Sequence, residues 1–451
     1  MKVNVEKIEN NVATLKIEVD AGEFEKALDQ SYRKNVKRFN IPGFRRGKAP
    51  RSLIERYYGP EVFYEDAAEI VLSEAYKKGV EENNLEPVDY PRFDIDQIGK
   101  GTGIVATAQV TVKPEVELGE YKGLEVEKMV YNVTEEDVEK ELKALQEQNA
   151  RLVSVERPAQ TGDVVVIDLE GFVNGEPLKD AKVQNYPVEL GSKILVEDLE
   201  NSITGMKAGE TKEVKVTYPA EHPNKDLAGK EVLFKVSLKE VKEKELPPID
   251  DEFAKDVSEF ETLEELKQDI KNRLEERAKS FSESSLRGSI LKKLVEQAKV
   301  DIPKVMVDRE IERLIMDFAF QLRLRGLDLK QYLEASQLSM EEFKGKFQER
   351  AYNNVKTSLV LEAVAKAENI EVSEEELDEE LAKYAESAQK SLAEYKKSLK
   401  EEDLEHIKDH ILTRKIFDFL KSHAKINEKI VERIVDNESE SEEESKLEEQ
   451  A

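Results

Sequence analysis

The chain has 451 residues and no cysteine, and its 70 Lys and Arg against 98 Asp and Glu give a formal net charge of −28. Without cysteine, a disulfide framework, a thiolate metal site and a thiol nucleophile are excluded. The longest apolar run, residues 164–167, is far shorter than the roughly 20 residues that span a bilayer, and the start has no apolar signal segment. We therefore expect a soluble cytoplasmic protein of roughly two to four domains.

The charge is unevenly distributed along the chain. Residues 436–451 form a Ser/Glu-rich tail with eight acids and one lysine, and we expect this tail to be disordered because it has little apolar surface to bury. Residues 30–54 contain no acid and eight basic residues: Arg33, Lys34, Lys37, Arg38, Arg45, Arg46, Lys48 and Arg51. This basic segment makes anionic partners such as nucleic acid plausible despite the overall charge.

Residues 1–113 are expected to form a small α+β domain. Apolar residues alternate with polar ones from Leu15 to Val19, which indicates a half-buried strand, and Asp20 is a candidate helix cap. A loop rich in Gly and Pro precedes a short helix that begins at Pro50. Strict alternation over residues 104–112 predicts another strand.

The next two segments differ in the secondary structure that their sequence patterns predict. Residues 114–150 form a connector and a helical arm, capped by Thr134 with Asp137, whose apolar stripe has no local partner. Residues 151–245 contain short β-rich runs separated by Gly, Asn and Pro turns, which is typical of a compact β-dominated domain. If the arm packs on the C-terminal body, the β-rich domain is an insertion.

Residues 246–435 are expected to be helical throughout. Helix starts are indicated at Thr262, Pro303 and Ser373. His406 and His410 have the i, i+4 spacing of a metal-binding pair, but no third ligand is evident, so we expect a solvated helix face and no metal site.

The loop around residues 42–50, with the sequence PGFRRGKAP, is the most specific local feature. Two glycines and two prolines constrain a tip with one aromatic and three cations, which suits docking on a phosphate-rich surface with Phe44 as an apolar anchor. A phosphate-binding P-loop needs four residues between its glycines and a Ser or Thr after the Lys, and neither is present. A solvated basic loop is the alternative.

This stretch resembles the ribosome-docking signature of bacterial trigger factor, a family of chaperones that meet nascent chains at the ribosomal tunnel exit. Residues 245–254, 302–310 and 363–372 also resemble the family. The resemblance implies a multidomain α+β fold: an N-terminal ribosome-binding domain, an inserted FKBP-like β-rich domain, an all-α C-terminal chaperone body and the disordered acidic tail. It implies contact with ribosomal protein and rRNA through Gly43, Phe44, Arg45, Arg46, Gly47, Lys48 and Pro50.

The resemblance further implies that residues 151–245 act as an FKBP-type peptidyl-prolyl isomerase. Rotating a peptide bond must overcome a barrier of about 18–20 kcal/mol, and an apolar, water-poor pocket can accept the twisted amide without metal or cofactor, so we expect none. The implied pocket residues are Leu169, Leu178, Tyr186, Leu195, Val196, Leu199, His222 and Phe234. Four of them, Leu169, Leu178, Leu199 and His222, stand where such isomerases usually have aromatics, so a module with weak or no catalysis is the alternative.

Residues 313–325 predict a helix that is apolar on most of its sides. Such a helix is usually core, but the resemblance favours a partly exposed face that binds unfolded clients. The candidate client-binding residues are Leu314, Met316, Phe318, Phe320 and Leu322.

The implied partners are the ribosome at its tunnel exit and nascent or unfolded polypeptides, without a membrane, and the resemblance allows for a homodimer when the chain is free. The implied function is ATP-independent chaperoning that keeps new proteins open and assists their folding or export. A general RNA-binding or helical scaffold protein is a more distant alternative.

Overall fold

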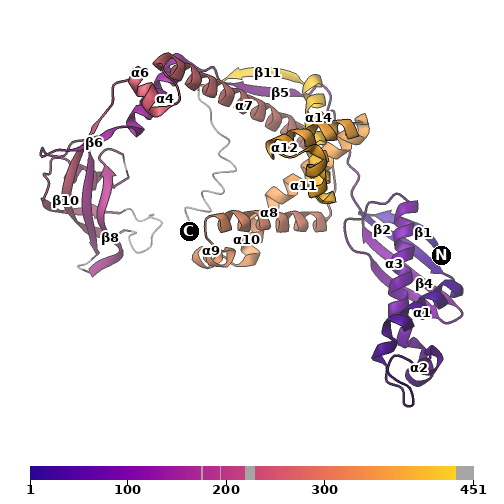
Figure 1. Ribbon diagram of the computed structural model, residues 1–451. Helices are drawn as coiled ribbons and strands as arrows, with labels where there is room; N and C mark the ends of the chain where they lie inside the picture. The colour runs from indigo at the N-terminus through magenta and orange to yellow at the C-terminus, as the bar shows by residue number, and fades with distance from the viewer. Residues whose placement is uncertain (174–175, 193, 219–228, 433–451) are drawn as a thin grey trace. The chain divides into compact units, whose positions relative to one another are not determined.

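The computed structural model describes residues 1–173, 176–192, 194–218 and 229–432, without the side chains of residues 176–181 (Figure 1). Residues 1–129 and 283–429 form one compact unit, and residues 130–282 belong to another. The acidic tail, for which we expect disorder, lies outside the described residues. In the described part of the chain, no helix is long and apolar enough to cross a membrane.

The N-terminal domain is an antiparallel four-stranded sheet with two helices packed on it, which confirms the predicted α+β fold. The strands follow the order β1 (Lys2–Glu9), β2 (Val12–Val19), β4 (Gly103–Thr111) and β3 (Arg92–Gly99). The two helices are α1 (Ala21–Asn35) and α3 (Tyr64–Glu82). Leu15 and Ile17 of β2 are fully buried beneath them, so the alternating strand faces the core as predicted.

The start of α1 follows from its cap. The Asp20 carboxylate accepts hydrogen bonds from the backbone N–H of Gly22 at 2.9 Å and of Glu23 at 3.0 Å, which satisfies two of the free donors at the helix start. The basic loop then separates α1 and the 3₁₀ turn η1 (Val36–Arg38) from α2 (Arg51–Tyr58). Pro50 precedes α2 as its N-cap instead of occupying its first turn.

The described residues of the β-rich domain form one antiparallel sheet with a short helix. Its strands are β6 (Arg151–Ser154), β7 (Val164–Val173), β8 (Glu176–Glu189), β9 (Thr211–Thr217) and β10 (Glu231–Glu245). The strand β10 pairs with β7 along one edge and with β9 and β6 along the other. Helix α5 (Glu197–Ile203) buries Leu199 and Ile203 in the same apolar core as Val232 and Val236 of β10.

The helical arm packs on the helices that follow the β-rich domain. Helix α4 (Glu135–Gln148) buries Val138 and Leu142 against α6 (Asp251–Val257) and the first half of α7 (Leu263–Gln297). The β-rich domain is thus inserted between two segments that share one apolar cluster. Asp137 forms the expected capping box with Thr134.

Up to residue 432, where the description of the structure ends, the rest of the C-terminal body contains the second half of α7 and seven further helices. They are α8 (Lys304–Leu324), α9 (Leu329–Ala335), α10 (Met340–Lys346), α11 (Gln348–Glu368), α12 (Glu374–Ser387), α13 (Leu392–Ser398) and α14 (Glu401–His423). The predicted helix starts at Thr262, Pro303 and Ser373 are confirmed.

The expectation of helix as far as residue 435 was wrong for the last segment. The final helix ends at His423, and β11 (Lys425–Ile430) pairs with β5 (Glu125–Val130). The backbone N–H of Lys425 donates to the carbonyl of Leu124 at 2.9 Å, so the free edge of β5 supplies hydrogen bonds that a local pattern does not reveal.

Candidate functional site

The basic loop is built from two tight turns between buried anchors. Ile41 and Ala49 are buried, whereas Arg45, Arg46 and Lys48 are not buried and Phe44 is 42% exposed. The N–H of Phe44 donates to the carbonyl of Ile41 at 3.1 Å, and the N–H of Lys48 donates to the carbonyl of Arg45 at 2.9 Å. The loop therefore presents its aromatic and its three cations on a defined tip.

Both predicted loop glycines are required by the backbone. Gly43 has φ +87° and Gly47 has φ +79°, the left-handed region that favours glycine. A Cβ at Gly47 would lie 3.1 Å from the Cγ of Lys37, because the loop folds back on η1. There the Nε of Arg46 donates to the carbonyl of Lys37 at 2.8 Å. This bond fixes the side chain of Arg46, and no local sequence pattern indicates it.

Two tyrosine hydroxyls fix the ends of the loop. The hydroxyl of Tyr58 donates to the carbonyl of Asn40 at 3.3 Å, where the loop begins. The hydroxyl of Tyr32 donates to the carbonyl of Ala49 at 2.9 Å, where it ends. Helices α1 and α2 therefore position the loop through side chains outside the GFRRGKAP stretch.

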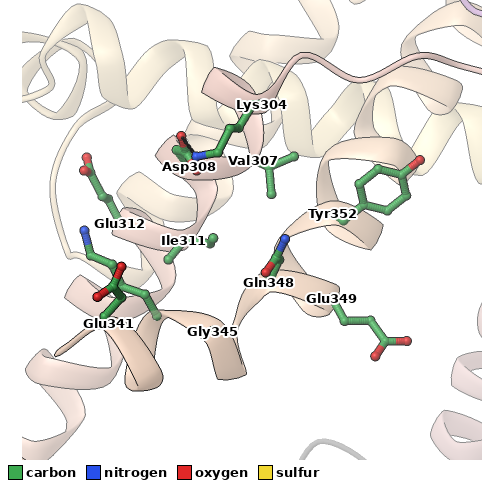
Figure 2. A pocket seen from close by; sticks show the side chains of 11 residues that line it. Lys304, Val307, Asp308, Ile311, Glu312, Glu341, Gly345, Gln348, Glu349 and Tyr352 are labelled. Atoms are coloured by element: carbon green, nitrogen blue, oxygen red, sulfur yellow. Dashed lines mark hydrogen bonds and ion pairs between the residues drawn. The ribbon is translucent and has the colours of Figure 1, made fainter. Parts of the chain in front are cut away.

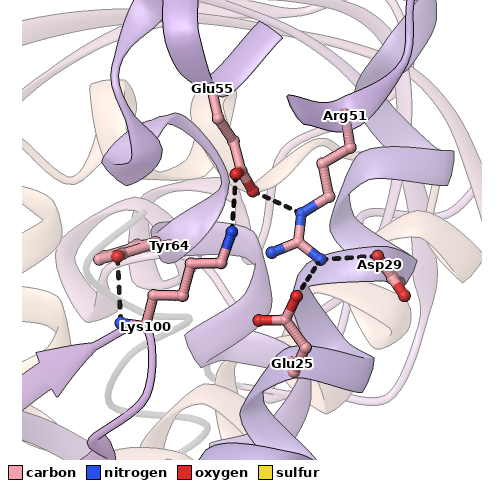
Figure 3. Close-up of polar contacts among 6 residues, drawn as sticks. All are labelled: Glu25, Asp29, Arg51, Glu55, Tyr64 and Lys100. Atoms are coloured by element: carbon pink, nitrogen blue, oxygen red, sulfur yellow. Dashed lines mark hydrogen bonds and ion pairs between the residues drawn. The ribbon is translucent and has the colours of Figure 1, made fainter. Parts of the chain in front are cut away.

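Arg51 does not belong to the docking charge, although it lies in the acid-free segment 30–54. Figure 3 shows its guanidinium enclosed by carboxylates: its terminal nitrogen lies 2.6 Å from Asp29 and 2.9 Å from Glu25, and its Nε lies 2.5 Å from Glu55. Burial would lower the pKa of Arg51, but these hydrogen bonds outweigh it and raise the pKa. Seven of the eight cations in residues 30–54 therefore lie outside this internal cluster.

The structure places four of the eight predicted isomerase residues in one apolar cluster. Leu199 and Phe234 are buried there, and Leu169 and Leu195 pack against it while partly exposed. Tyr186 and Val196 are outside that core, 38% and 37% exposed. His222 and the side chain of Leu178 lie outside the described residues.

A polar cluster that no local sequence pattern indicates supports Tyr186. The carboxylate of Asp168 accepts from the N–H of Asn185 at 2.7 Å and pairs with Lys239 at 2.8 Å. Lys239 also donates to the Asn185 side chain at 2.7 Å. These bonds brace β8 beside an irregularity in its pairing with β7, and they hold Asn185 at φ +53° directly before Tyr186. Hydrogen bonds to Lys239 and Asn185 lower the pKa of Asp168.

Helix α8 has a buried side and an exposed apolar side. Leu314 and Leu322 are 6% and 7% exposed in the core, and Phe318 packs against the ring of Tyr332 with centroids 5.1 Å apart. Leu314 and Leu322 were predicted to bind clients, but both side chains are buried in the core and are not accessible to a client.

The exposed side of α8 is a stripe of three apolar residues. Met316, Phe320 and Leu324 are 64%, 56% and 68% exposed, and they follow each other at four-residue spacing, so they lie on one face. Leu324 was not among the predicted residues, although its spacing from Phe320 would have identified it. We call these three residues the α8 stripe.

A groove of about 880 Å³ lies between α8, α10 and α11 (Figure 2). Val307 and Ile311 line it from α8, and Gln348 and Tyr352 from α11. Lys304, on the α8 side, pairs with Asp308 at 2.7 Å. Because its walls come from three helices, no single stretch of sequence indicates this groove.

The two histidines with the i, i+4 spacing lie on the surface. His406 and His410 are exposed on α14. Across the described ranges, His, Asp and Glu side chains form no group of three that could hold a metal ion.

Three family models match the chain. The bacterial trigger factor model matches residues 1–145, the model of the bacterial trigger factor C-terminus matches 262–422, and the FKBP-type peptidyl-prolyl cis-trans isomerase model matches 155–239. A protein named Trigger factor from Acetivibrio thermocellus is 52% identical, covering 94% of this chain and 100% of that protein. One of the same name from Ruminiclostridium cellulolyticum is 50% identical, covering 95% and 100%.

A solved structure is also similar in sequence over most of the chain. It is titled "Promiscuous Substrate Recognition in Folding and Assembly Activities of the Trigger Factor Chaperone" and is 26% identical, covering 94% of this chain and 99% of that one, with a TM-score of 0.49.

Proposed function

Because the chain belongs to the bacterial trigger factor family and carries an FKBP-type peptidyl-prolyl isomerase domain, we propose that it is an ATP-independent chaperone that docks on the ribosome through the loop 42–50. Docked there, it meets nascent chains, shields their apolar segments and isomerises their prolines. The proposed attachment places this work in the cytoplasm, at the tunnel exit.

The geometry of the basic loop supports docking best. Phe44 is exposed, and Arg45, Arg46 and Lys48 follow it on a tip that carries no acid and is fixed by two turns. A cationic tip with one apolar anchor suits a surface of RNA and protein, since phosphates attract the cations and an apolar contact adds affinity. Arg46, held by Lys37, is preorganised and loses little freedom on binding.

Charge reversal of the tip tests docking. The double variant Arg45→Glu, Arg46→Glu should lose co-sedimentation with ribosomes at low salt, because four units of charge change at the docking surface. The matched control Lys77→Glu, Lys78→Glu makes the same charge change on exposed positions of α3 and should still co-sediment. Equal binding by both variants would reject docking through the loop.

The α8 stripe is the proposed client surface. The stripe (Met316, Phe320 and Leu324) is exposed on a helix whose opposite side is anchored in the core. A client can therefore bind this apolar surface without any loss of conformational entropy in the helix. Met and Phe are adaptable side chains that hold unfolded segments with little sequence preference. We further propose that held clients pass on to folding or export and that the free chain can form a homodimer, which sedimentation over a concentration series would test.

A chaperone with feeble isomerase activity is the second candidate. Leu169 and Leu199 stand where FKBP-type isomerases usually have aromatics, which favours this candidate. A protease-coupled assay on a proline peptide separates the two, since a rate equal to the uncatalysed background would favour the second.

A further inference from the structure

A row of aromatic rings leads from the core of the N-terminal domain to its surface beside the basic loop. Phe63 is fully buried, and its ring centroid lies 5.4 Å from that of Phe39. The Phe39 ring lies 5.3 Å from the Tyr58 ring, which lies 5.4 Å from the Tyr57 ring. Each ring thus supports the next, and the outermost pair at the end of α2 is held from below.

The outer two rings are exposed. Tyr57 is 64% exposed and Tyr58 is 48% exposed. Proteins that bind unpaired nucleotides use such supported aromatic faces, because every base can stack on them whatever its sequence.

The same rings are tied to the docking loop. The hydroxyl of Tyr58 holds the carbonyl of Asn40 at the start of the loop. Tyr32, whose ring lies 6.0 Å from Phe63, holds the carbonyl of Ala49 at its end. The exposed pair and the cationic tip therefore belong to one braced structure.

The charge around the pair favours an anionic partner. Arg56 precedes Tyr57 on α2, Lys37 and Arg38 precede Phe39, and all three are exposed. The acid nearest to Tyr57 in the sequence is Glu55, and it is already paired with Arg51 at 2.5 Å and with Lys100 at 3.0 Å. The next acid along the chain after Tyr58 is Glu61. An apolar peptide would gain nothing from these cations, whereas a nucleotide offers both a ring and a phosphate.

We propose that Tyr57 and Tyr58 form a stacking platform for unpaired bases of ribosomal RNA, while the cations of the loop hold the neighbouring phosphates. This proposal rests on the proposed docking function and specifies the partner of these two rings, which is RNA with exposed bases. Tyr57, the more exposed ring, carries the larger part of the stacking.

Binding of the full-length chain to purified ribosomes tests the proposal. Tyr57→Phe keeps the ring and should bind within about twofold of the unmodified chain, whereas Tyr57→Leu keeps apolar area without a ring and should bind about 5- to 100-fold more weakly. Tyr90→Leu is the matched control and should bind normally, since Tyr90 is 85% exposed in the same domain but outside the loop and α2.

Crosslinking identifies the partner. With p-benzoylphenylalanine in place of Tyr57, the crosslinked product should contain ribosomal RNA, and crosslinks to ribosomal protein alone would overturn the platform. If Arg45→Glu, Arg46→Glu abolishes binding while Tyr57→Leu does not weaken it, only the platform is overturned. If neither variant weakens binding, docking through the loop itself is overturned.

Discussion

Arg51 and Glu55 lie one turn apart on α2, with the Arg51 Nε 2.5 Å from the carboxylate of Glu55, and the same carboxylate binds Lys100 from the turn after β3 at 3.0 Å. The other side of the guanidinium reaches Glu25 and Asp29 on α1. Two helices and a sheet turn are therefore joined at the base of the docking loop.

Removal of this cation should loosen α2. Arg51→Ala leaves Glu55, whose side chain is only 11% exposed, without its closest partner, and we expect the packing of α2 on α1 to be less stable by about 1–3 kcal/mol. Hydrogen exchange of α2 amides in the full chain measures it. Arg51→Lys should rescue only in part, because an ammonium cannot reproduce the planar fork, and Arg56→Ala on the same helix should have no such effect. Normal protection of α2 in Arg51→Ala would contradict the role of this cluster.

Asp137 should make the arm sensitive to acid. Its carboxylate accepts from the hydroxyl of Thr134 at 2.7 Å and from the N–H of Thr134 at 2.9 Å, and these bonds lower the pKa of Asp137 from 3.8 to about 2. A lowered pKa in the folded state means that the stabilisation is present above about pH 4 and is lost as the pH falls toward about 2.

The variant Asp137→Asn keeps an acceptor oxygen but cannot titrate. The difference between urea midpoints at about pH 5 and about pH 2.5 should therefore be smaller in this variant than in the unmodified chain. An equal difference would mean that Asp137 does not carry this acid sensitivity.

Tyr186 should matter for isomerisation without mattering for folding. Tyr186→Ala should lower kcat/KM in the proline-peptide assay. Because the Tyr186 side chain is 38% exposed, this variant should leave the unfolding midpoint unchanged. Val183→Ala is the matched control, since Val183 is 37% exposed on the same strand. Phe234→Ala is a poorer probe, because removal of this buried ring should also destabilise the domain by about 3–5 kcal/mol. Unchanged kcat/KM in Tyr186→Ala would remove Tyr186 from the site.

The α8 stripe should be needed for holding clients. The triple variant Met316→Ser, Phe320→Ser, Leu324→Ser should suppress aggregation of an unfolded protein less well, because it offers clients much less apolar surface, while the fold stays intact. Gln321→Ser, Arg323→Ser changes exposed polar positions of the same helix that do not line the groove, and it should hold clients normally. Full suppression by the triple variant would locate the client surface elsewhere, and the groove between α8, α10 and α11 would be the next candidate.

Local signals in the sequence predicted much of the fold. Caps such as Asp20 and Ser373 satisfy donors within one turn, so they can be read from neighbouring residues. The alternation in β2 likewise reports its burial directly. The loop 42–50 stands out in the sequence because its glycines, prolines and cations are contiguous.

Features made by distant residues could not be predicted in this way. The neutralisation of Arg51 depends on Glu25 and Asp29 from another helix, and β11 depends on an edge strand about 300 residues away in the chain. Helix α8 has apolar residues on most of its sides, so only its packing in the fold decides which side is buried. The sequence therefore could not show that Leu314 is buried and Phe320 is exposed. The rings that frame the docking loop are likewise assembled by the tertiary fold.

The salt dependence of ribosome affinity tests the central claim most directly. If the loop cations hold phosphates, the affinity of the unmodified chain should fall steeply with salt, and Arg45→Gln, Arg46→Gln should bind more weakly, with a logarithmic salt slope smaller by about one for each phosphate that the variant no longer neutralises. Lys77→Gln, Lys78→Gln should match the unmodified chain in both affinity and slope. An unchanged affinity and slope in the loop variant would contradict docking through this loop.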